Sequence, residues 1–177
     1  HQPTHQYYQA NAAELASKYS QARPGYLDQI ISLLRPIDKV ISPDSPSLLD
    51  VGCGSGRDVV VPRAAGIQAS GIDPSAELIK AGANQHQLPA DCLQCGSLPE
   101  LADTKQQYQA VLCAAVLQHI PDPQLLDSLY QLHQRVAPGG FLLISVPKRY
   151  PVDPNGCDQH GRLFMLRPPE QYSFFVE

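Results

Sequence analysis

The sequence has no long apolar run. None of its hydrophobic stretches approaches the roughly 20 residues that a membrane-spanning helix needs. Its start, HQPTHQYYQANAAE, lacks the charged and then apolar pattern of a secretory signal. The chain has 177 residues, 43% of them hydrophobic, which is enough to bury a core. These features predict a soluble globular protein without a membrane partner.

Charged residues and cysteines are also few. Charged residues make up 17% of the chain, its net charge is -4, and it has no dense run of Lys or Arg, which argues against a nucleic-acid partner. Five cysteines, an odd number without secretory context, predict reduced thiols and a cytoplasmic location. The pairs Cys92–Cys95 and Cys157–His160 could together form a zinc site. We favour coincidence, because the fold predicted below separates the two pairs, so no metal is expected.

The spacing of apolar residues predicts alternating strands and helices after two initial helices. The initial helices cover 4–22 and a stretch from Pro24 to Pro36, with a loop at 42–47. The expected strands are 47–51, 67–73, 93–96, 108–116 and 141–146. The expected helices are 57–65, 75–85, one from Asp122 to a stop at 138–140, and a last one beginning at 168, after a polar loop at 147–167. This order predicts an α/β fold with a doubly wound, mainly parallel sheet and helices on both faces.

Two local signals refine this prediction. Ser75 is expected to cap the helix that follows it. Pro62 lies inside the helix predicted at 57–65, so we expect that helix to be bent or irregular. We divide the chain into helices that cover the binding site, 1–46, and a binding core, 47–177.

The stretch LLDVGCGSGRD, residues 48–58, predicts a ligand site. Its glycines follow a strand and precede a helix, where backbone N–H groups and a helix dipole are free to meet a ligand. Asp73 ends the next strand, where it could hold a ribose. The spacing is GxGxG and not the GxGxxG of dinucleotide sites, because Arg57 occupies the position of the third glycine. Asp50 would repel a pyrophosphate but suits a cationic amino-acid ligand. The alternatives are a dinucleotide site or a glycine turn without a ligand.

Several motifs in order resemble the class I S-adenosylmethionine-dependent methyltransferases. LLDVGCGSGRD resembles their motif I, and GIDPS at 71–75 resembles their second motif. LQCGSLPEL at 93–101, YQAVLCAAVLQHIPD at 108–122 and VAPGGFLLISVP at 136–147 resemble their third, fourth and fifth strand regions. The resemblance runs from about residue 7 to the end. It implies a Rossmann-like methyltransferase fold and S-adenosylmethionine as the cofactor.

The resemblance also implies roles for individual residues. Asp50 would lie near the amino group of the cofactor, Asp73 would hold the ribose hydroxyls, and Ala114 would face the sulfonium. Arg23 could pair with the cofactor's carboxylate. The remaining predicted cofactor-binding residues are Gly52, Cys53, Gly54, Ser55 and Gly56 in the turn, Pro74, Ser97 and Leu98 around the adenine, and Tyr19 in the upstream helix.

The chain departs from the family pattern in two places. The acid that often binds the adenine amino group is missing, because the corresponding segment reads Cys95-Gly96-Ser97. The family's C-terminal antiparallel hairpin is also missing, since the chain stops at SFFVE. The strand from Phe141 to Val146 would then be a bare, apolar sheet edge, which invites pairing. We therefore expect a longer natural protein, a covering by residues 147–177, or a homodimer.

The sequence predicts the reaction more clearly than the acceptor. After the fourth strand the chain reads Ala114-Ala115-Val116-Leu117-Gln118-His119, without the Asn/Asp-Pro-Pro-Tyr motif of amine methylases and without an acidic metal cluster. His119 is the candidate catalytic base or substrate contact, and its alternative role is capping or packing. His160, Lys148, Arg149 and Arg162 lie in the 147–167 loop, which is either solvated or recruits an anionic acceptor. We predict methyl transfer to a small molecule; the alternative is a non-catalytic cofactor-binding domain of a longer protein.

Overall fold

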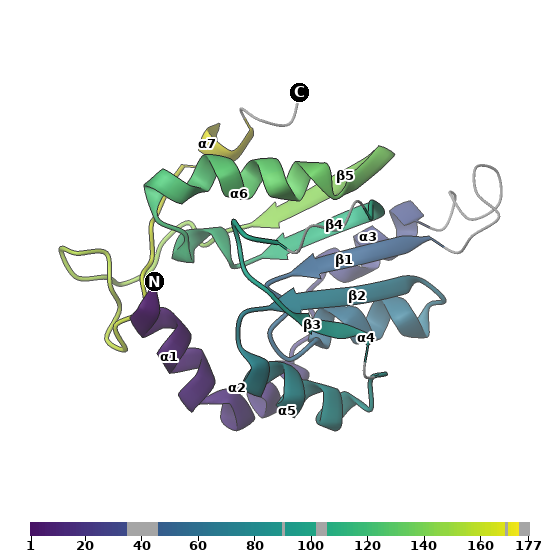
Figure 1. The fold of residues 1–177 in the computed structure, drawn as a ribbon, viewed down its shortest axis with the longest axis horizontal. Helices are drawn as coiled ribbons and strands as arrows, with labels where there is room; N and C mark the ends of the chain where they lie inside the picture. The colour runs from purple at the N-terminus through teal and green to yellow at the C-terminus, as the bar shows by residue number, and fades with distance from the viewer. Residues whose placement is uncertain (35–45, 90, 102–105, 169, 174–177) are drawn as a thin grey trace.

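The computed structural model describes residues 1–34, 46–89, 91–101, 106–168 and 170–173. Five strands form one sheet in the order β3-β2-β1-β4-β5, and each pairing between them is parallel. The strands are β1 (Ser47–Val51), β2 (Gln68–Asp73), β3 (Leu93–Cys95), β4 (Tyr108–Ala114) and β5 (Val136–Ser145). The predicted doubly wound parallel sheet is therefore confirmed. All five strands end on one side of the molecule (Figure 1).

Helices cover both faces of the sheet (Figure 1). They are α1 (Gln2–Ala10), α2 (Ala12–Ser20), α3 (Tyr26–Leu34), α4 (Arg57–Ala64), α5 (Ala76–His86), α6 (Asp122–Gln134) and α7 (Glu170–Ser173), with a 3₁₀ helix at Leu117–His119. Strand alternation separates two cores: Leu48 of β1 packs with α3 and α4, whereas Leu49 packs with α6 and Tyr172 of α7. Helices α1 and α2 pack on Leu78 of α5. The sheet is thus buried on both faces, as a parallel sheet requires.

The single helix predicted at 4–22 is wrong, because the chain breaks at Asn11. Asn11 has φ -108° and ψ 16°, outside the helical region, and its side-chain Nδ2 donates to the carbonyl of Tyr7 at 2.8 Å. An asparagine side chain that bonds nearby backbone competes with the helix. Helix α1, before the break, lies on the side of the molecule where the strands end (Figure 1), and its Thr4 and Tyr8 line the cavity there.

The predicted stop at 138–140 is also wrong, because α6 ends at Gln134 and β5 begins at Val136. Tyr108 pairs with Val136 and Ala110 pairs with Phe141, so β5 carries extra residues here, which form a bulge. A Cβ on Gly140 would lie 2.7 Å from the carbonyl oxygen of Gln109, which explains the glycine. Among the described residues no strand pairs with the outer side of β5, so it is the sheet edge that we predicted.

The remaining local predictions have mixed outcomes. The cap is confirmed: the Ser75 hydroxyl accepts the N–H of Leu78 at 3.2 Å. Helix α4 runs from Arg57 to Ala64 with Pro62 inside it, so the proline does not end the helix, and the expected bend stays a prediction. Most of the loop predicted at 42–47 and the end of the helix predicted from 168 lie outside the described residues. Of the described helices, none combines the length and the apolar character needed to cross a bilayer.

Candidate functional site

The glycine turn joins β1 to α4 in a backbone conformation that other residues rarely adopt. Gly52, Gly54 and Gly56 have φ values of +79°, +56° and +76°, all in the left-handed region that glycine tolerates. A Cβ on Gly52 would lie 2.1 Å from Cγ2 of Val116. A Cβ on Gly54 would meet nothing closer than Leu78 at 3.5 Å, so the turn is open at its middle.

Asp73, at the end of β2, organises this turn. Its carboxylate accepts the N–H of Gly54 at 2.8 Å and the N–H of Ser75 at 2.9 Å. Burial raises the pKa of Asp73, and these two hydrogen bonds oppose that shift. One acid therefore fixes both the glycine turn and the start of α5, and each of its oxygens retains a lone pair for a ligand.

A cavity of about 300 Å³ lies beside the turn, at the carboxyl ends of β1, β2 and β4. It brings together most of the predicted cofactor-binding residues: Tyr19, Asp50, Gly52, Cys53, Gly54, Ser55, Asp73, Pro74, Ser97, Leu98 and Ala114. His119 also lines it. Two predicted residues lie elsewhere. A Cβ on Gly56 would meet Leu93 at 2.8 Å, and Arg23 forms an exposed ion pair with Asp28.

The cavity wall is acidic. Among the described residues that line it are Asp50, Asp58 and Asp73 but only one Lys or Arg, which is Arg57. The Arg57 guanidinium binds both carboxylate oxygens of Asp58, at 2.5 and 2.8 Å, and Tyr26 donates to the same carboxylate. Burial, helped by the nearby charges of Asp58 and Asp73, raises the pKa of Asp50 well above its usual range. A cationic ligand would stabilise the ionised form of Asp50, whereas a pyrophosphate would add a further negative charge beside it, so the cavity suits a cation better than a pyrophosphate.

His119 is held at both ring nitrogens. Its Nδ1 lies 2.5 Å from the carbonyl oxygen of Leu163 and its Nε2 lies 3.3 Å from the Tyr8 hydroxyl. Because a carbonyl can only accept, Nδ1 carries the proton and Nε2 presents its lone pair to Tyr8. Burial lowers the pKa of His119 to about 4 and raises that of Tyr8 to about 12. At neutral pH both side chains are therefore uncharged.

His119 is expected to make the protein less stable in acid. Its pKa is about 4 in the folded chain and 6.5 in the unfolded chain, so the unfolded state binds more protons between these values. The contribution of neutral His119 to the free energy of unfolding is complete above pH 6.5, and about 3 kcal/mol of that free energy is lost as the pH falls to 4. Chemical denaturation at both pH values would measure it. His119→Gln should lose this dependence, and the exposed His133→Gln should keep it; equal pH slopes in all three proteins would contradict the assignment.

Several cavity residues carry no recognisable sequence signal. Thr4 and Tyr8 come from α1, more than forty residues before the glycine turn in the chain. No spacing rule connects that helix to the ends of the strands. Arg57 and Asp58 could have been predicted as site residues, because they directly follow the glycines. Their pairing with each other was not predicted.

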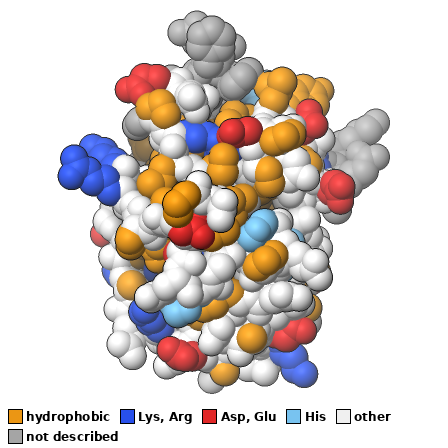
Figure 2. Space-filling model, turned by 90° about the vertical axis from the view of Figure 1, so that its left-hand side faces the viewer, with side chains coloured by type: hydrophobic (Ala, Val, Ile, Leu, Met, Phe, Trp, Pro, Cys, Tyr) orange, Lys and Arg blue, Asp and Glu red, His pale blue; other side chains and the backbone are white. Residues whose placement is uncertain are grey.

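The basic residues of the 147–167 loop do not share one environment. Arg162 is buried and paired with Asp158 at 2.7 Å, whereas Lys148 and Arg149 are exposed. Figure 2 looks onto the side where the strands end, and basic side chains lie mainly toward its margins. Because Arg162 is paired with Asp158, it is not a free cation for an anionic acceptor. Within the described ranges, no group of three or more His, Cys, Asp or Glu residues could hold a metal ion.

Comparisons with known proteins point to one family. A family model described as a methyltransferase domain matches residues 7–174. The ubiquinone biosynthesis O-methyltransferase of Coxiella burnetii is 32% identical over 119 residues, covering 66% of this chain and 50% of that protein. The protein of the same name from Psychrobacter arcticus is 36% identical over 111 residues, covering 59% and 42%. The chain thus spans about half the length of these curated relatives.

Solved structures share the fold at lower identity. The SAH complex of DhpI is 23% identical, with a TM-score of 0.62, and the match covers 97% of this chain and 83% of that one. SAM-bound CalS10, an amino pentose methyltransferase from Micromonospora echinaspora, is 21% identical, with a TM-score of 0.60 and coverage of 77% and 58%. The parallel sheet, the glycine turn and a family match over nearly the whole chain agree: the chain belongs to the methyltransferase-domain family.

Proposed function

We propose that this domain binds S-adenosylmethionine in the acidic cavity and transfers its methyl group to the hydroxyl of a small acceptor. The observation that carries the proposal is the left-handed glycine turn, whose middle is open and which is fixed by Asp73 beside the buried Asp50. The names of the curated relatives, which are O-methyltransferases, support a hydroxyl acceptor.

The residues present suit this cofactor. Its sulfonium and ammonium are cationic, and the described part of the cavity lining carries three carboxylates against one guanidinium, which is already paired with Asp58. The buried Ser55 hydroxyl has no partner among the described residues and lines the cavity, so a ligand can satisfy it. The open side of Gly54 leaves room for a ligand to approach the backbone.

Each lining residue then has a specific task. Asp73 holds the ribose hydroxyls with its remaining lone pairs, and Asp50 pairs with the ammonium group. Pro74, Ser97 and Leu98 lie around the adenine, and Ala114 and Tyr19 lie near the sulfonium and methionine parts, with Gly52, Cys53, Gly54 and Ser55 as the floor. Of the N-terminal segment, helices α1 and α2 serve as the cover, because they supply residues that line the cavity. Arg23 and Gly56 do not line the cavity and have no direct contact with the cofactor in this proposal.

The chain contributes mainly positioning to the reaction. When bound, S-adenosylmethionine supplies a methyl group on an already activated sulfonium. Holding the reacting atoms in line can supply about 7–11 kcal/mol. A hydroxyl acceptor must also lose its proton, and the Nε2 lone pair of His119 faces the cavity side where Tyr8 lies. Because that lone pair already accepts from the Tyr8 hydroxyl, we assign a relay: Tyr8 takes the proton of the acceptor hydroxyl and passes its own proton to Nε2 of His119.

Titration calorimetry tests the cofactor assignment. S-adenosylmethionine and S-adenosylhomocysteine are expected to bind, and NAD is not. Turnover with catechol as a phenolic acceptor, measured as S-adenosylhomocysteine released, then tests the reaction. His119→Gln should keep cofactor binding and lose turnover, and the exposed His133→Gln should keep both. Tight binding of NAD alone would overturn the proposal; cofactor binding without turnover of any acceptor would favour a non-catalytic binding domain.

The remaining partner predictions belong to the same proposal. The acidic cavity and the lack of a concentrated basic surface on the face in Figure 2 support a small-molecule acceptor over nucleic acid. We propose that the outer edge of β5 is covered by a second copy of the chain or by a further C-terminal segment. We retain a cytoplasmic location as part of this proposal.

A further inference from the structure

The segment 157–167, which we call the strap, crosses between α1 and the 3₁₀ helix that carries His119. Leu163 bonds to both: its N–H donates to the hydroxyl of Thr4 at 3.0 Å, and its carbonyl accepts from Nδ1 of His119. The N–H of Met165 also donates to the carbonyl of Gln118 at 2.7 Å. The strap therefore ties together two walls of the cavity that lie far apart in the sequence.

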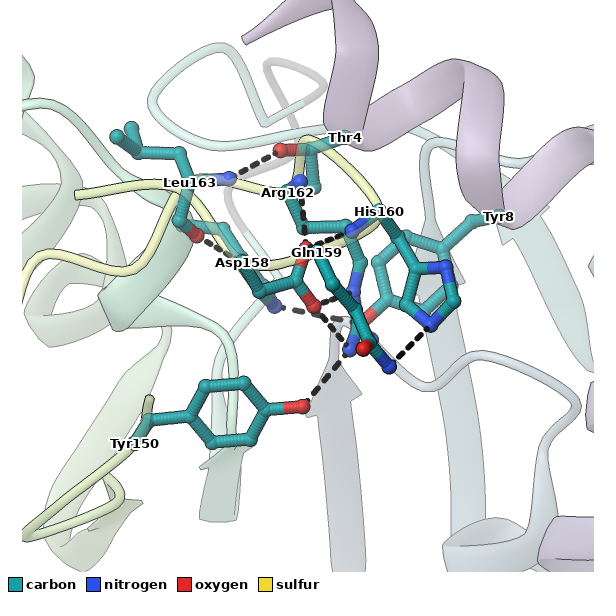
Figure 3. A network of polar contacts seen from close by, with 9 residues as sticks. Thr4, Tyr8, Tyr150, Asp158, Gln159, His160, Arg162 and Leu163 are labelled. Carbon is teal, nitrogen blue, oxygen red and sulfur yellow. Dashed lines mark hydrogen bonds and ion pairs between the residues drawn. The ribbon is translucent and has the colours of Figure 1, made fainter. Parts of the chain in front are cut away.

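Arg162 is the charged centre of this strap (Figure 3). Its Nε and Nη2 donate to one carboxylate oxygen of Asp158 at 2.9 and 2.7 Å, and Nη2 also donates to the hydroxyl of Tyr150 at 2.9 Å. Its guanidinium lies over the ring of Tyr7, 4.6 Å from the centroid. A buried charge costs several kcal/mol unless it is well paired, so these contacts fix where the guanidinium lies.

Arg162 also reaches the residues of the reaction. Its Nη1 donates to the hydroxyl of Tyr8 at 3.3 Å, and that hydroxyl donates to Nε2 of His119. The neighbouring Leu163 holds Nδ1 of the same ring. Both nitrogens of His119 are thus oriented through two consecutive strap residues, one by a side-chain relay and one by the backbone.

The other strap arginine has a different role. Arg167 donates to the carbonyls of Leu117 and Ile120 at 2.9 and 2.6 Å and pairs with Asp122 at 2.7 Å. These contacts stabilise the 3₁₀ helix and the start of α6, and none of them involves Tyr8 or His119. Arg167 is therefore a natural comparison for a purely structural arginine on the same segment.

On the basis of the methyl transfer proposed above, we propose that Arg162 is a positioning residue, which locks the strap onto α1 and so fixes Tyr8 and His119 at the acceptor side of the cavity. Its charge is neutralised by Asp158 within the protein, so it does not recruit an anionic acceptor. The proposal predicts that Arg162 acts on the transfer step and on the His119 ring, with little effect on cofactor binding.

The charges around His119 make the role measurable without turnover. Tyr8 from α1 contacts the His119 ring, and Arg162 and Asp158 from the strap and the amino group of His1 act on it electrostatically. The Arg162 cation lowers the pKa of His119, and Asp158 raises it. Removing the cation should therefore raise the pKa of His119, whereas Arg162→Lys should leave it low.

The experiment compares the wild type with Arg162→Met, Arg162→Lys, Arg167→Met and the exposed Arg149→Met. The measurements are the His119 ring pKa by NMR in the free protein, the Kd for S-adenosylmethionine, and kcat and KM with catechol and its carboxylate-bearing analogue. Arg162→Met should raise the His119 pKa and lower kcat by about 10-fold to 100-fold, because a small misplacement of reacting groups is costly. Its Kd should change by less than about threefold, well within 1 kcal/mol.

The conservative variant separates charge from geometry. Arg162→Lys should keep the low His119 pKa but still lose about 10-fold in kcat, because an ammonium cannot reproduce the planar fork. Arg167→Met should leave the His119 pKa unchanged, and Arg149→Met should change nothing. Unchanged kcat in Arg162→Met, or a loss confined to the KM of the carboxylate analogue, would overturn the proposal.

Two outcomes need separate readouts. If Arg162→Met does not fold, Thr4→Val and Tyr150→Phe each remove one strap hydrogen bond while preserving shape, and a kcat indistinguishable from wild type in both would overturn the proposal. If the wild type shows no turnover, the proposed function fails, and the NMR titration decides the positioning role alone. An unshifted His119 pKa in Arg162→Met would then count against it.

Discussion

Replacing Asp73 with asparagine is expected to weaken S-adenosylmethionine binding by about 100-fold or more. A hydrogen bond to a charged group contributes about 1.5–3 kcal/mol, and the substitution affects two ribose contacts. It also presents an amide where the carboxylate now accepts the N–H groups of Gly54 and Ser75. Calorimetry with S-adenosylmethionine measures the change.

Glu77→Gln is the matched control for this prediction. It removes one exposed carboxylate from the first turn of α5, four residues after Asp73, and should bind the cofactor as the wild type does. Thermal unfolding of both variants would separate loss of ligand contacts from loss of the turn. Wild-type affinity in Asp73→Asn would mean that the ribose is held elsewhere.

The binding turn could be predicted from the sequence because its causes are local. A strand that ends in glycines has few alternatives, and the left-handed φ values of Gly52, Gly54 and Gly56 are those that only glycine tolerates readily. Parallel pairing then brings Asp73 to the same edge as the turn. Strand order and the shared cavity follow from these rules and from the family resemblance.

The acceptor side could not be predicted because its contacts are long-range. Tyr8 and His119 are 111 residues apart, and Leu163 lies 159 residues from the Thr4 side chain that it binds. Such pairs depend on the orientation of helix α1. That orientation depends on the helix break at Asn11, which the pattern of apolar residues did not indicate. From the sequence, Arg162 could be identified only as one of several basic residues in the 147–167 loop. Its pairing with Asp158 depends on burial, which the sequence did not indicate.

The same distinction explains the errors at the element ends. Pro138-Gly139-Gly140 carries strong stop signals, yet β5 passes through it, because pairing with β4 accommodates a bulge. The glycine motif predicted that Gly56 contacts the ligand, but a Cβ added at this position would point toward Leu93 in the core. A local signal for glycine does not say whether a ligand or a neighbouring side chain needs the space.

Gly52→Ala tests how much the close approach at the turn matters. Positive φ alone costs an alanine about 1–2 kcal/mol. The added Cβ would also lie 2.1 Å from Val116, and relieving such overpacking costs about 1–3 kcal/mol more. We therefore expect Gly52→Ala to lower the free energy of unfolding by about 2–5 kcal/mol, measured by chemical denaturation, and to impair cofactor binding.

Gly66→Ala separates the two causes, because Gly66 has φ +87° and no atom within 4 Å of an added Cβ. It should show only the conformational cost, about 1–2 kcal/mol. Pairing Gly52→Ala with Val116→Ala makes room for the new methyl group and should recover the steric part, which a double-mutant cycle would report as a favourable coupling. If Gly52→Ala costs no more than Gly66→Ala, and the cycle shows no coupling, then the contact with Val116 does not constrain the turn and only its φ requires glycine.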